Sequence, residues 1–543
     1  MMFNKQLSGD LFGGLTAAVV ALPLALAFGV SSGMGAIAGL YGAIAIGIFA
    51  SLFGGTKTQI SGPTGPMTVV AASVVAAEVA HFGTLEAAMG AIVVTFVLAG
   101  LFQILFGVIR IGQYVKYMPY PVISGFMSGI GVIIIILQIF PFFGLESPQG
   151  ILATLGALAT IPGNINMAAV FLALGTIATI YLAPKVTKLV PSPLIALILF
   201  TIITVMLDLE VPLIGEIPTG LPEIHWDAFS KMDWHDPMLI IIAALTLAAL
   251  GAIDSLLTSV VADNMTKTQH DSNKELVGQG IGNALAGIIG GIPGAGATMR
   301  TVVNINTGGN SKISGIFHGA VLLVILLGAG AYAKLIPLPV LAGILITVGI
   351  GILDYKSIKD IKYIPRSDAI IMVMVLLLTV LVDLLQAVAV GMVMASLWFM
   401  KQMGDSAAKK SHGRSVEDLA QMGLIGAELS EKLSDKLYIQ NFNGPIFFGF
   451  SFGFKELMRQ VPDVEYVVFR MKNVPYIDQS GMYAIEEAVM DLQNKNIKVF
   501  FCYLQPQPKD MLSKIGLFPN LVPEENLFDD FKKLVASLEE KQG

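Results

Sequence analysis

Apolar runs of about 20 residues recur along the first 400 positions of this 543-residue chain, and an α-helix needs about that length to cross a bilayer. We predict fourteen membrane spans, of which the third and tenth are short and interrupted by Gly and Pro. They begin near Leu11, Met34, Thr64, Leu85, Pro119, Ala168, Pro191, Met238, Glu275, Thr298, Ile313, Leu335, Asp368 and Leu384. A cleaved secretory signal is not favoured, because further spans follow the first at once.

Charged residues are scarce in the apolar part and dense after it. Of the 33 Lys and Arg and 39 Asp and Glu, 35 lie in the first 400 positions and 37 in the last 143. The whole chain is only 13% charged, against about 25% in soluble domains, which excludes a disordered chain, a nucleic-acid-binding protein and an ordinary soluble enzyme. We predict a transmembrane domain at 1–402, a linker or helix at 403–436 and a polar domain at 437–543.

Loop charges predict the orientation of these spans. With the N-terminus placed in the cytoplasm, twelve Lys and Arg fall in loops assigned inside and only Lys231 and Lys334 in loops assigned outside. This is the positive-inside bias of membrane proteins. An even number of spans returns the chain to the cytoplasm before the polar domain, so both termini are expected there.

Three segments of the first half recur in the second, in the same order. Leu15–Ala25 matches Leu245–Ser255 and Pro63–Thr68 matches Pro293–Thr298, both at an offset of 230; Met118–Gly125 matches Ile336–Gly343 at 218. We therefore predict two repeats, at about 8–207 and 237–402. Seven spans per repeat is an odd number, so equivalent helices point in opposite directions, a design typical of secondary transporters.

The second matched pair places Gly and Pro at membrane depth. Backbone groups freed there must face protein or a watery cavity, because lipid cannot satisfy them. We predict half-helices that start at Thr64 and Thr298 near the bilayer midplane. In an inverted repeat the two N-termini face each other, and their free N–H groups favour an anion between them. Two kinked packing helices are the alternative.

Asp254 lies inside an apolar run, where an unpaired carboxylate costs at least about 2.5–3.5 kcal/mol. Thr258 lies one turn further on the same helix face, and Ser255 adjoins the acid. Carboxylate, hydroxyl and carbonyl oxygens suit a small hard cation such as Na⁺, and Gly296 and Thr298 could complete this ligand set. A proton on Asp254, or an aspartate hydrogen-bonded only for packing, are the alternatives. The first repeat has Leu24 at the aligned position, so we expect one cation site.

Other polar residues at membrane depth have less specific interpretations. Arg300 could add positive charge to the anion pocket, pair with an acid or extend toward water. Glu78 and Glu275 are expected at the membrane interface, and His318 is expected to be packed. The sequence has no metalloenzyme spacing, nucleotide-binding loop or nucleophile elbow. We therefore expect neither an enzyme nor a primary pump, and no organic cofactor.

The polar tail alternates short strands and helices, which predicts a small α/β domain. Strands are expected at 437–441, 446–448, 465–469 and 497–503, and helices at 482–491 and 528–540. Asp478, Ser480 and Gly481 precede the first of these helices and are good turn or cap residues there. The single cysteine, Cys502, excludes an intrachain disulfide.

Taken together, six motifs resemble those of the sulfate permease (SulP) family of anion transporters. They are Gly9-Asp-Leu-Phe-Gly-Gly-Leu-Thr16, the Pro23 region, Gly62-Pro-Thr-Gly-Pro-Met-Thr68, Asp254-Ser-Leu-Leu-Thr258, Gly294-Ala-Gly-Ala-Thr-Met-Arg300 and Thr307-Gly-Gly309. The tail resembles the family's STAS domain, whose Asp-x-Ser-Gly element reads here Asp478-Gln-Ser480-Gly481.

This resemblance covers nearly the whole chain and implies its architecture. It implies an α-helical polytopic membrane protein with fourteen segments in a seven-plus-seven inverted repeat and a small cytoplasmic STAS domain. A core domain of spans 1–4 and 8–11 would move against a gate domain of spans 5–7 and 12–14. It also implies a homodimer, with the STAS domain contributing to assembly or regulation.

Within the family, the chain is similar to the cyanobacterial Na⁺-dependent bicarbonate transporters in the run Leu15–Gly29 and in its aspartate and threonine of span 8. This similarity implies that Na⁺ binds beside Ser255. It also implies that the anion lies between the segments 64–68 and 297–298, with Arg300 as a further candidate anion-binding residue. The implied cation ligands are Asp254, Thr258, Gly296 and Thr298. The implied anion-binding residues are Thr64, Gly65, Thr68, Ala297 and Thr298. Ser480 matches a position phosphorylated in bacterial anti-sigma-factor antagonists.

The resemblance therefore predicts a Na⁺-coupled bicarbonate symporter of the bacterial inner membrane, working by elevator-like alternating access. Pro23-Leu24 stands where many sulfate permeases have Pro-Gln, which fits a smaller, singly charged anion, whereas Arg300 would suit a dianion. A proton-coupled or exchange-type carrier of sulfate or C4-dicarboxylates is the main alternative, and a channel or sensor is another. The expected partners are a small inorganic anion, Na⁺, membrane lipid and a second copy of the chain, but no nucleic acid.

Overall fold

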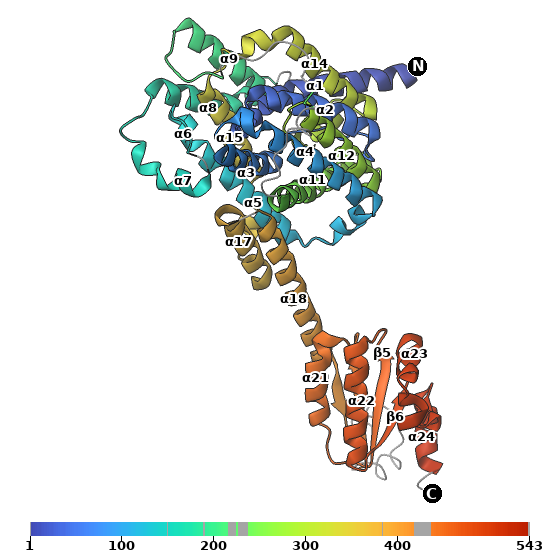
Figure 1. Cartoon of the computed structure of the whole chain (residues 1–543). Coiled ribbons are helices and arrows are strands. Elements are labelled where there is room, and N and C mark those ends of the chain that lie inside the picture. Colours follow the sequence, from blue (N-terminus) through green and yellow to red (C-terminus); the bar gives the residue numbers. More distant parts are fainter. Residues whose placement is uncertain are drawn as a thin grey trace. The chain divides into compact units, whose positions relative to one another are not determined.

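The structure is a computed structural model that describes residues 2–148, 150–187, 191–214, 224–225, 237–382, 384–416 and 436–540. The chain divides into two compact units, Met1–Met392 and Val393–Gly543 (Figure 1). Of the linker or helix predicted at 403–436, residues 417–435 lie outside the described residues; the part before them contains the end of helix α18, which runs to Lys410, and a short strand at His412–Arg414.

A helix stands at each of the fourteen predicted spans. In chain order they are α1 (Met2–Ser31), α2 (Ala36–Phe53), α3 (Gly65–Phe82), α4 (Leu85–Val108), α5 (Tyr120–Leu137), α8 (Met167–Val186), α9 (Ser192–Met206), α11 (Pro237–Thr266), α12 (Ser272–Ile288), α13 (Thr298–Asn306), α14 (Lys312–Ala333), α15 (Leu338–Ile352), α17 (Arg366–Leu381) and α18 (Leu384–Lys410). Two short helices, α6 (Ile139–Phe142) and α7 (Ile151–Gly156), lie between α5 and α8. The predicted spans are thereby confirmed as helices.

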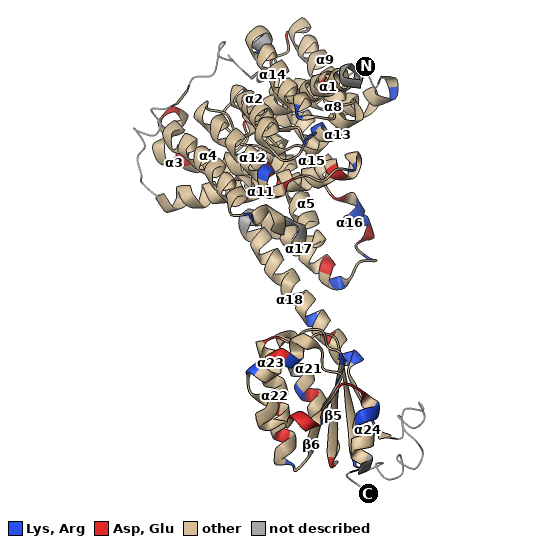
Figure 2. Ribbon diagram, turned by 90° about the vertical axis from the view of Figure 1, so that its right-hand side faces the viewer, with Lys and Arg blue, Asp and Glu red and all other residues tan. Residues whose placement is uncertain are grey.

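Many of these helices have the length and composition of membrane spans. Among the described residues, α1, α2, α3, α4, α5, α8, α11 and α18 are long and apolar enough to cross a bilayer, and α9, α14 and α15 are shorter apolar helices. Figure 2 shows few charged residues on the helices of the first unit and many on the second. The uneven charge in the sequence therefore corresponds to two structurally different units.

Helix contacts in the first unit come in reciprocal pairs. Helix α2 packs on α14, and its repeat equivalent α12 packs on α4, the equivalent of α14. The other equivalent helices are α1 and α11, α3 and α13, α5 and α15, and α8 and α17. Accordingly, α1 contacts α13 while α11 contacts α3, and α5 contacts α17 while α15 contacts α8. Exchanging the repeats leaves this pattern unchanged, as expected for two halves related by a two-fold axis. The internal repeat is confirmed, and the two halves are interlocked rather than side by side.

The same contacts separate the first unit into two groups of helices. Helices α1 to α4 pack with α11 to α14, whereas α5, α8 and α9 pack with α15 and α17. The groups meet where α1 passes α9 and α15, and where α3 passes α5. The first group has the membership of the expected core, and the second has that of the expected gate apart from the fourteenth span, α18, which these contacts do not assign.

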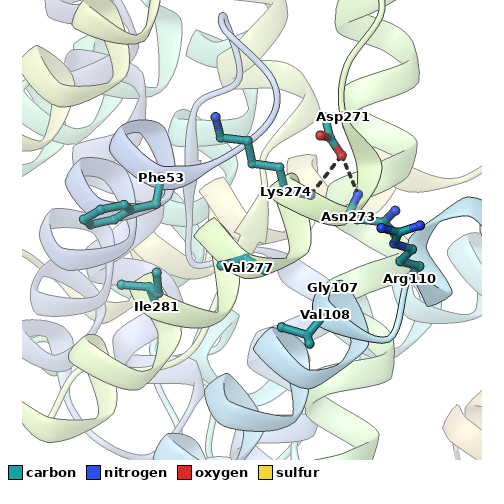
Figure 3. Close-up of a pocket in the computed structure, with 9 residues that line it drawn as sticks. All are labelled: Phe53, Gly107, Val108, Arg110, Asp271, Asn273, Lys274, Val277 and Ile281. Carbon is teal, nitrogen blue, oxygen red and sulfur yellow. Dashed lines mark hydrogen bonds between the residues drawn. The ribbon is translucent and has the colours of Figure 1, made fainter.

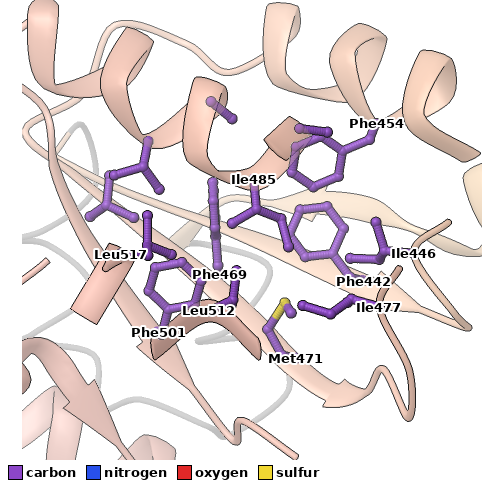
Figure 4. Packing of buried hydrophobic residues seen from close by; sticks show 14 of the residues in the cluster. Phe442, Ile446, Phe454, Phe469, Met471, Ile477, Ile485, Phe501, Leu512 and Leu517 are labelled. Atoms are coloured by element: carbon purple, nitrogen blue, oxygen red, sulfur yellow. The ribbon is translucent and has the colours of Figure 1, made fainter. Parts of the chain in front are cut away.

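The second unit contains a five-stranded sheet. Its strands are β3 (His412–Arg414), β4 (Leu437–Asn443), β5 (Tyr466–Asn473), β6 (Lys498–Cys502) and β7 (Leu527–Phe528), in that order. Strands β4 to β7 are parallel and β3 is antiparallel to β4. Side chains alternate between the two faces of a strand. Phe469 and Phe501 therefore lie in one buried cluster, with Phe442 and Phe454 (Figure 4), while Val468 and Phe500 lie in another.

The helices of this unit partly depart from the sequence predictions. Helices α22 (Gln479–Asn494) and α24 (Phe531–Glu540) were predicted, but α21 (Phe448–Arg459) and α23 (Pro506–Lys514) were not. The strand predicted at 446–448 is wrong, because Ile446 makes only an isolated bridge with Ile477 and α21 starts at Phe448. Its aromatic residues have high strand propensity, but Phe450 and Phe454 are four residues apart and share one buried helix face.

Candidate functional site

The two interrupted segments meet in the first unit. Strand β1 (Ser61–Gly62) pairs antiparallel with β2 (Ala295–Gly296), so that Ser61 lies opposite Gly296. Helix α3 starts three residues after β1, and α13 starts two residues after β2. Each of these helices is thus preceded by a short extended segment at membrane depth; α13, with nine residues, is short as predicted, whereas α3 is a continuous helix of 18 residues.

No side chain caps the N-terminus of either half-helix. Thr64 precedes α3 and Ala297 precedes α13, and neither makes a side-chain capping hydrogen bond. The first N–H groups of a helix have no partner within it and add to its positive end. Pro66 lacks an N–H, so α3 presents fewer donors than α13. Both ends, brought together by β1 and β2, are suited to an anion.

Asp254 lies directly beside the start of α3. Its carboxylate is 8% exposed and accepts a hydrogen bond of 2.8 Å from the Thr64 hydroxyl. Because α11 is continuous through this region, the carboxylate is held at the level of the broken segments. A buried carboxylate with one hydroxyl donor is incompletely compensated, which favours a cation or proton beside it.

One turn further along α11, three oxygens converge. The Thr258 hydroxyl lies 2.9 Å from the Gly296 carbonyl and 2.7 Å from the Thr298 hydroxyl. On the adjacent turn the Ser255 hydroxyl accepts a hydrogen bond of 3.1 Å from the Gly296 N–H. Neutral hydroxyl and carbonyl oxygens next to a carboxylate form a donor set for a hard cation. The structure thus joins four residues of the candidate cation site, Ser255, Thr258, Gly296 and Thr298, by hydrogen bonds, and the fifth, Asp254, adjoins Ser255 in α11 and contacts Thr64.

The candidate anion residues lie in two different environments. Thr298 and Met299 are exposed at the start of α13, Met299 by 73%, whereas Arg300 is on the opposite, buried face. The Arg300 Nη2 donates to the Pro63 carbonyl, and the Thr68 hydroxyl donates to the Thr64 carbonyl. Both side chains therefore support the backbone that leads into α3, and the exposed N-terminal turn of α13 is the part open to a ligand.

Sequence reasoning missed a row of polar residues along α12. Glu275, Gln279 and Asn283 are four residues apart and buried on one face. Glu275, which was expected at the membrane interface, is only 1% exposed and lies in the first turn of α12; its depth in the membrane stays a prediction. The four-residue spacing of polar side chains in an otherwise apolar helix was the signal that could have identified them.

This α12 polar row holds both broken segments. Asn283 pairs with Gly294, donating to its carbonyl at 3.0 Å and accepting from its N–H at 2.8 Å. Gln279 donates to the Ser61 hydroxyl at 2.6 Å. Glu275 accepts from the Gly55 and Thr56 N–H groups, both at 2.8 Å. The row therefore fixes the entry to β1 and the entry to β2 from a single helix.

A second missed group links the same loop to α11. The Ser259 hydroxyl donates to the Gln59 side-chain oxygen at 2.9 Å and lies 2.8 Å from the Thr56 hydroxyl. Gln59 also donates to Glu275 at 2.8 Å. Ser259 follows Ser255 by one turn, so α11 carries the cation candidates and a loop anchor on neighbouring turns.

Two further expectations concern residues away from this crossing. His318 is fully buried in α14, which confirms that it is packed inside the protein. In the second unit, Asp478 caps α22 by accepting from the Gly481 N–H at 2.8 Å, as predicted. Ser480 is exposed in the first turn of that helix, where a modifying enzyme has access to its hydroxyl.

Interlocked repeats, with two helix N-termini brought together by a short strand pair beside a buried carboxylate, are typical of the class of inverted-repeat secondary transporters. Comparison with known proteins identifies the family within that class. The profile of the sulfate permease family matches residues 7–375 and that of the STAS domain matches 430–534. The chain belongs to the sulfate permease family, and it is a multi-pass membrane protein.

Three relatives are similar over most of their length. The chain is 43% identical to the "Bicarbonate transporter BicA" of Picosynechococcus sp., over 96% of this chain and 93% of that protein. It is 45% identical to the "Bicarbonate transporter BicA" of Synechocystis sp., over 97% and 93%. The solved transmembrane domain of a cyanobacterial bicarbonate transporter BicA has a TM-score of 0.65 and 48% identity, covering 70% of this chain and 97% of that one.

Proposed function

We propose that this protein is a Na⁺-coupled bicarbonate symporter. The observation that carries the proposal is the hydrogen bond between Asp254 and Thr64, because it joins the candidate cation site to the residue that precedes the anion-facing helix. The substrate is inferred from the two relatives named as bicarbonate transporters, which match nearly the whole chain.

Coupling follows from the charges at this crossing. Without a cation, the Asp254 carboxylate repels an anion at the start of α3. Na⁺ held by Asp254, Thr258, Gly296 and Thr298, with Ser255 supporting the Gly296 backbone, removes that repulsion. The two ions then favour each other's binding, a reciprocal coupling typically of about 1–3 kcal/mol.

The anion is proposed to bind mainly to backbone. The N–H groups at Gly65, Ala297 and Thr298 and the hydroxyl of Thr64 surround the space between the half-helices. Arg300 and Thr68 contribute indirectly, through the Pro63 and Thr64 carbonyls that they hold. A site built from N–H groups and one fixed positive charge behind them fits a small, singly charged anion.

The helix groups supply the proposed motion. The group of α1 to α4 and α11 to α14 carries the whole site and moves as a core against a gate of α5, α8, α9, α15, α17 and α18. We further propose that both termini are cytoplasmic, in a bacterial inner membrane, and that two copies form a dimer. Transport requires no organic cofactor and no catalytic step, and Ser480 is a candidate regulatory phosphosite.

Uptake of radiolabelled bicarbonate into proteoliposomes tests this proposal. We expect concentrative uptake that requires an inward Na⁺ gradient and is not competed by sulfate or fumarate. Asp254→Ala should abolish the Na⁺-dependent part, while Asp263→Asn is the matched control, because Asp263 lies on the same helix but pairs with His270 at 2.7 Å near its end.

Three outcomes would contradict the assignment. Wild-type Na⁺ stimulation in Asp254→Ala removes the cation site. Uptake in Na⁺-free buffer at acidic pH, competed by sulfate or fumarate, favours a proton-coupled or exchange-type carrier of dianions. Flux that fails to concentrate the anion favours a channel.

A further inference from the structure

A pocket of about 510 Å³ lies away from the ion site, between the ends of α2, α4 and α12 (Figure 3). Phe53 closes one side, Val108 and Arg110 the other, and Val277 and Ile281 line the part between them. Its volume is within the range of small-molecule sites. The lining comes from the ends of α2 and α4 and the start of α12, and we expect a membrane surface near this level because a spanning helix ends where the bilayer ends.

The walls of this pocket are fixed by close helix packing. A Cβ atom at Gly107 would lie 2.5 Å from the Asn273 carbonyl oxygen, so the end of α4 and the start of α12 are in direct backbone contact. The end of α2 is held by Lys312, whose Nζ donates to the Leu52 and Gly54 carbonyls at 3.1 and 2.6 Å. The pocket is therefore preformed.

The pocket combines an apolar floor with a basic mouth. Val108 is 66% exposed and Phe53 is 43% exposed, both large apolar side chains facing outward. Arg110 and Lys274 are exposed, and within the described residues neither side chain makes a hydrogen bond or ion pair. The single acid of the lining, Asp271, is occupied in capping α12, where it accepts from the Asn273 and Lys274 N–H groups at 3.1 Å.

We propose that this pocket binds one anionic phospholipid molecule. Its phosphate would lie between Arg110 and Lys274, and the upper part of an acyl chain against Phe53, Val277 and Ile281. Basic pockets between transmembrane helices near a membrane surface have this preference. A soluble anion would not use the apolar floor, and a zwitterionic lipid would not match two free cations. The site is independent of which ions the protein transports.

Native mass spectrometry of the purified full-length protein with added lipid tests the proposal. We expect phosphatidylglycerol to be retained in preference to phosphatidylcholine, and not to be displaced by excess glycerol phosphate. Each basic residue near an anionic headgroup strengthens binding about fivefold. The double variant Arg110→Gln/Lys274→Gln should therefore bind phosphatidylglycerol about 30-fold more weakly.

Matched variants separate this effect from misfolding. Val108→Glu changes an exposed side chain, so it should fold normally and still lose phosphatidylglycerol by repulsion. Lys185→Gln/Lys356→Gln and Val186→Glu place the same changes at exposed positions outside the pocket and should have no effect. Equal retention of both lipids by the wild type, displacement by glycerol phosphate, or wild-type retention by Val108→Glu would each overturn the proposal.

Discussion

Replacing Glu275 by methionine tests whether the α12 polar row maintains the ion site. Glu275 accepts four hydrogen bonds: Oε2 from the Gly55 and Thr56 N–H groups, both at 2.8 Å, and Oε1 from the Gln59 and Gln279 amides at 2.8 and 2.9 Å. Methionine has a similar shape but no strong acceptor. The two glutamine amides can turn toward other partners, whereas the two backbone N–H groups are fixed by the loop.

The magnitude follows from those two backbone groups. A buried donor left without an acceptor costs about 1–3 kcal/mol, so Glu275→Met should destabilise the hydrogen-bonded loop by about 2–6 kcal/mol. A tenfold change in an equilibrium constant corresponds to about 1.4 kcal/mol. Even the lower value of about 2 kcal/mol therefore shifts the equilibrium between the native and the released loop by roughly 30-fold. The apparent affinity of a ligand falls with the fraction of competent protein. We therefore expect the Na⁺ concentration for half-maximal uptake to rise, by at most about 30-fold for a shift of about 2 kcal/mol, together with a lower thermal unfolding temperature.

Two companion variants make the result interpretable. Glu275→Gln keeps one oxygen for Gly55 and Thr56, and the facing glutamine amides can turn, so its effect should be much smaller. Glu86→Met changes an exposed glutamate in the first turn of α4 and should leave uptake unchanged. The reasoning is refuted if Glu275→Met has wild-type Na⁺ dependence and thermal stability, or if Glu275→Gln is equally damaged.

Two predictions concern titratable groups outside the membrane spans. Burial raises the pKa of Cys502 to about 12, so its thiolate should be about 1000-fold rarer than for a thiol of ordinary pKa 9.0. Maleimide labelling at pH 7.5 should therefore be slow in the folded protein and fast after denaturation. Rapid labelling of the native state would contradict this. At Asp354, which precedes α16 (Tyr355–Asp360), burial raises the pKa, but hydrogen bonds from Ser124, Ser357 and Tyr120 together outweigh it and lower the pKa to about 2. The stabilisation that comes with a lowered carboxyl pKa is complete above the ordinary value of about 4 and is lost only as the pH falls toward 2. Asp354→Asn should therefore lower the unfolding temperature equally at pH 5.5 and 8, with Asp360→Asn as the control; a loss that is larger at pH 5.5 than at pH 8 would show that the pKa is raised instead.

Much of the membrane fold was predictable because it depends on local composition. The length of an apolar run is set by bilayer thickness, so helices could be placed at positions such as Leu85 and Leu384 from the sequence alone. The breaks before α3 and α13 were also predictable, since Gly and Pro at membrane depth cannot continue a lipid-exposed helix. Asp254 was conspicuous for the same reason, as an isolated charge in an apolar run.

Features that depend on contacts between distant segments were not predictable. The burial of Glu275 depends on its hydrogen bond with the loop at Gly55, about 220 positions earlier in the chain. Likewise the orientation of Arg300, away from the exposed turn of α13, depends on the Pro63 carbonyl in the other repeat. The residues of α21 have strand propensity, and only the sheet beneath Phe450 and Phe454 selects a helix.

The reciprocal packing of α2 with α14 and of α4 with α12 has a consequence for biogenesis. Helix α2 ends at Phe53 and its partner α14 begins at Lys312, 259 residues later. At a synthesis rate of about 5–20 residues per second, the faces of α2 and α4 stay uncovered for roughly 10–50 s after they leave the ribosome. The first seven helices must therefore wait in the bilayer as incompletely packed segments, and a chain truncated between the repeats should be degraded rather than accumulate as a folded half.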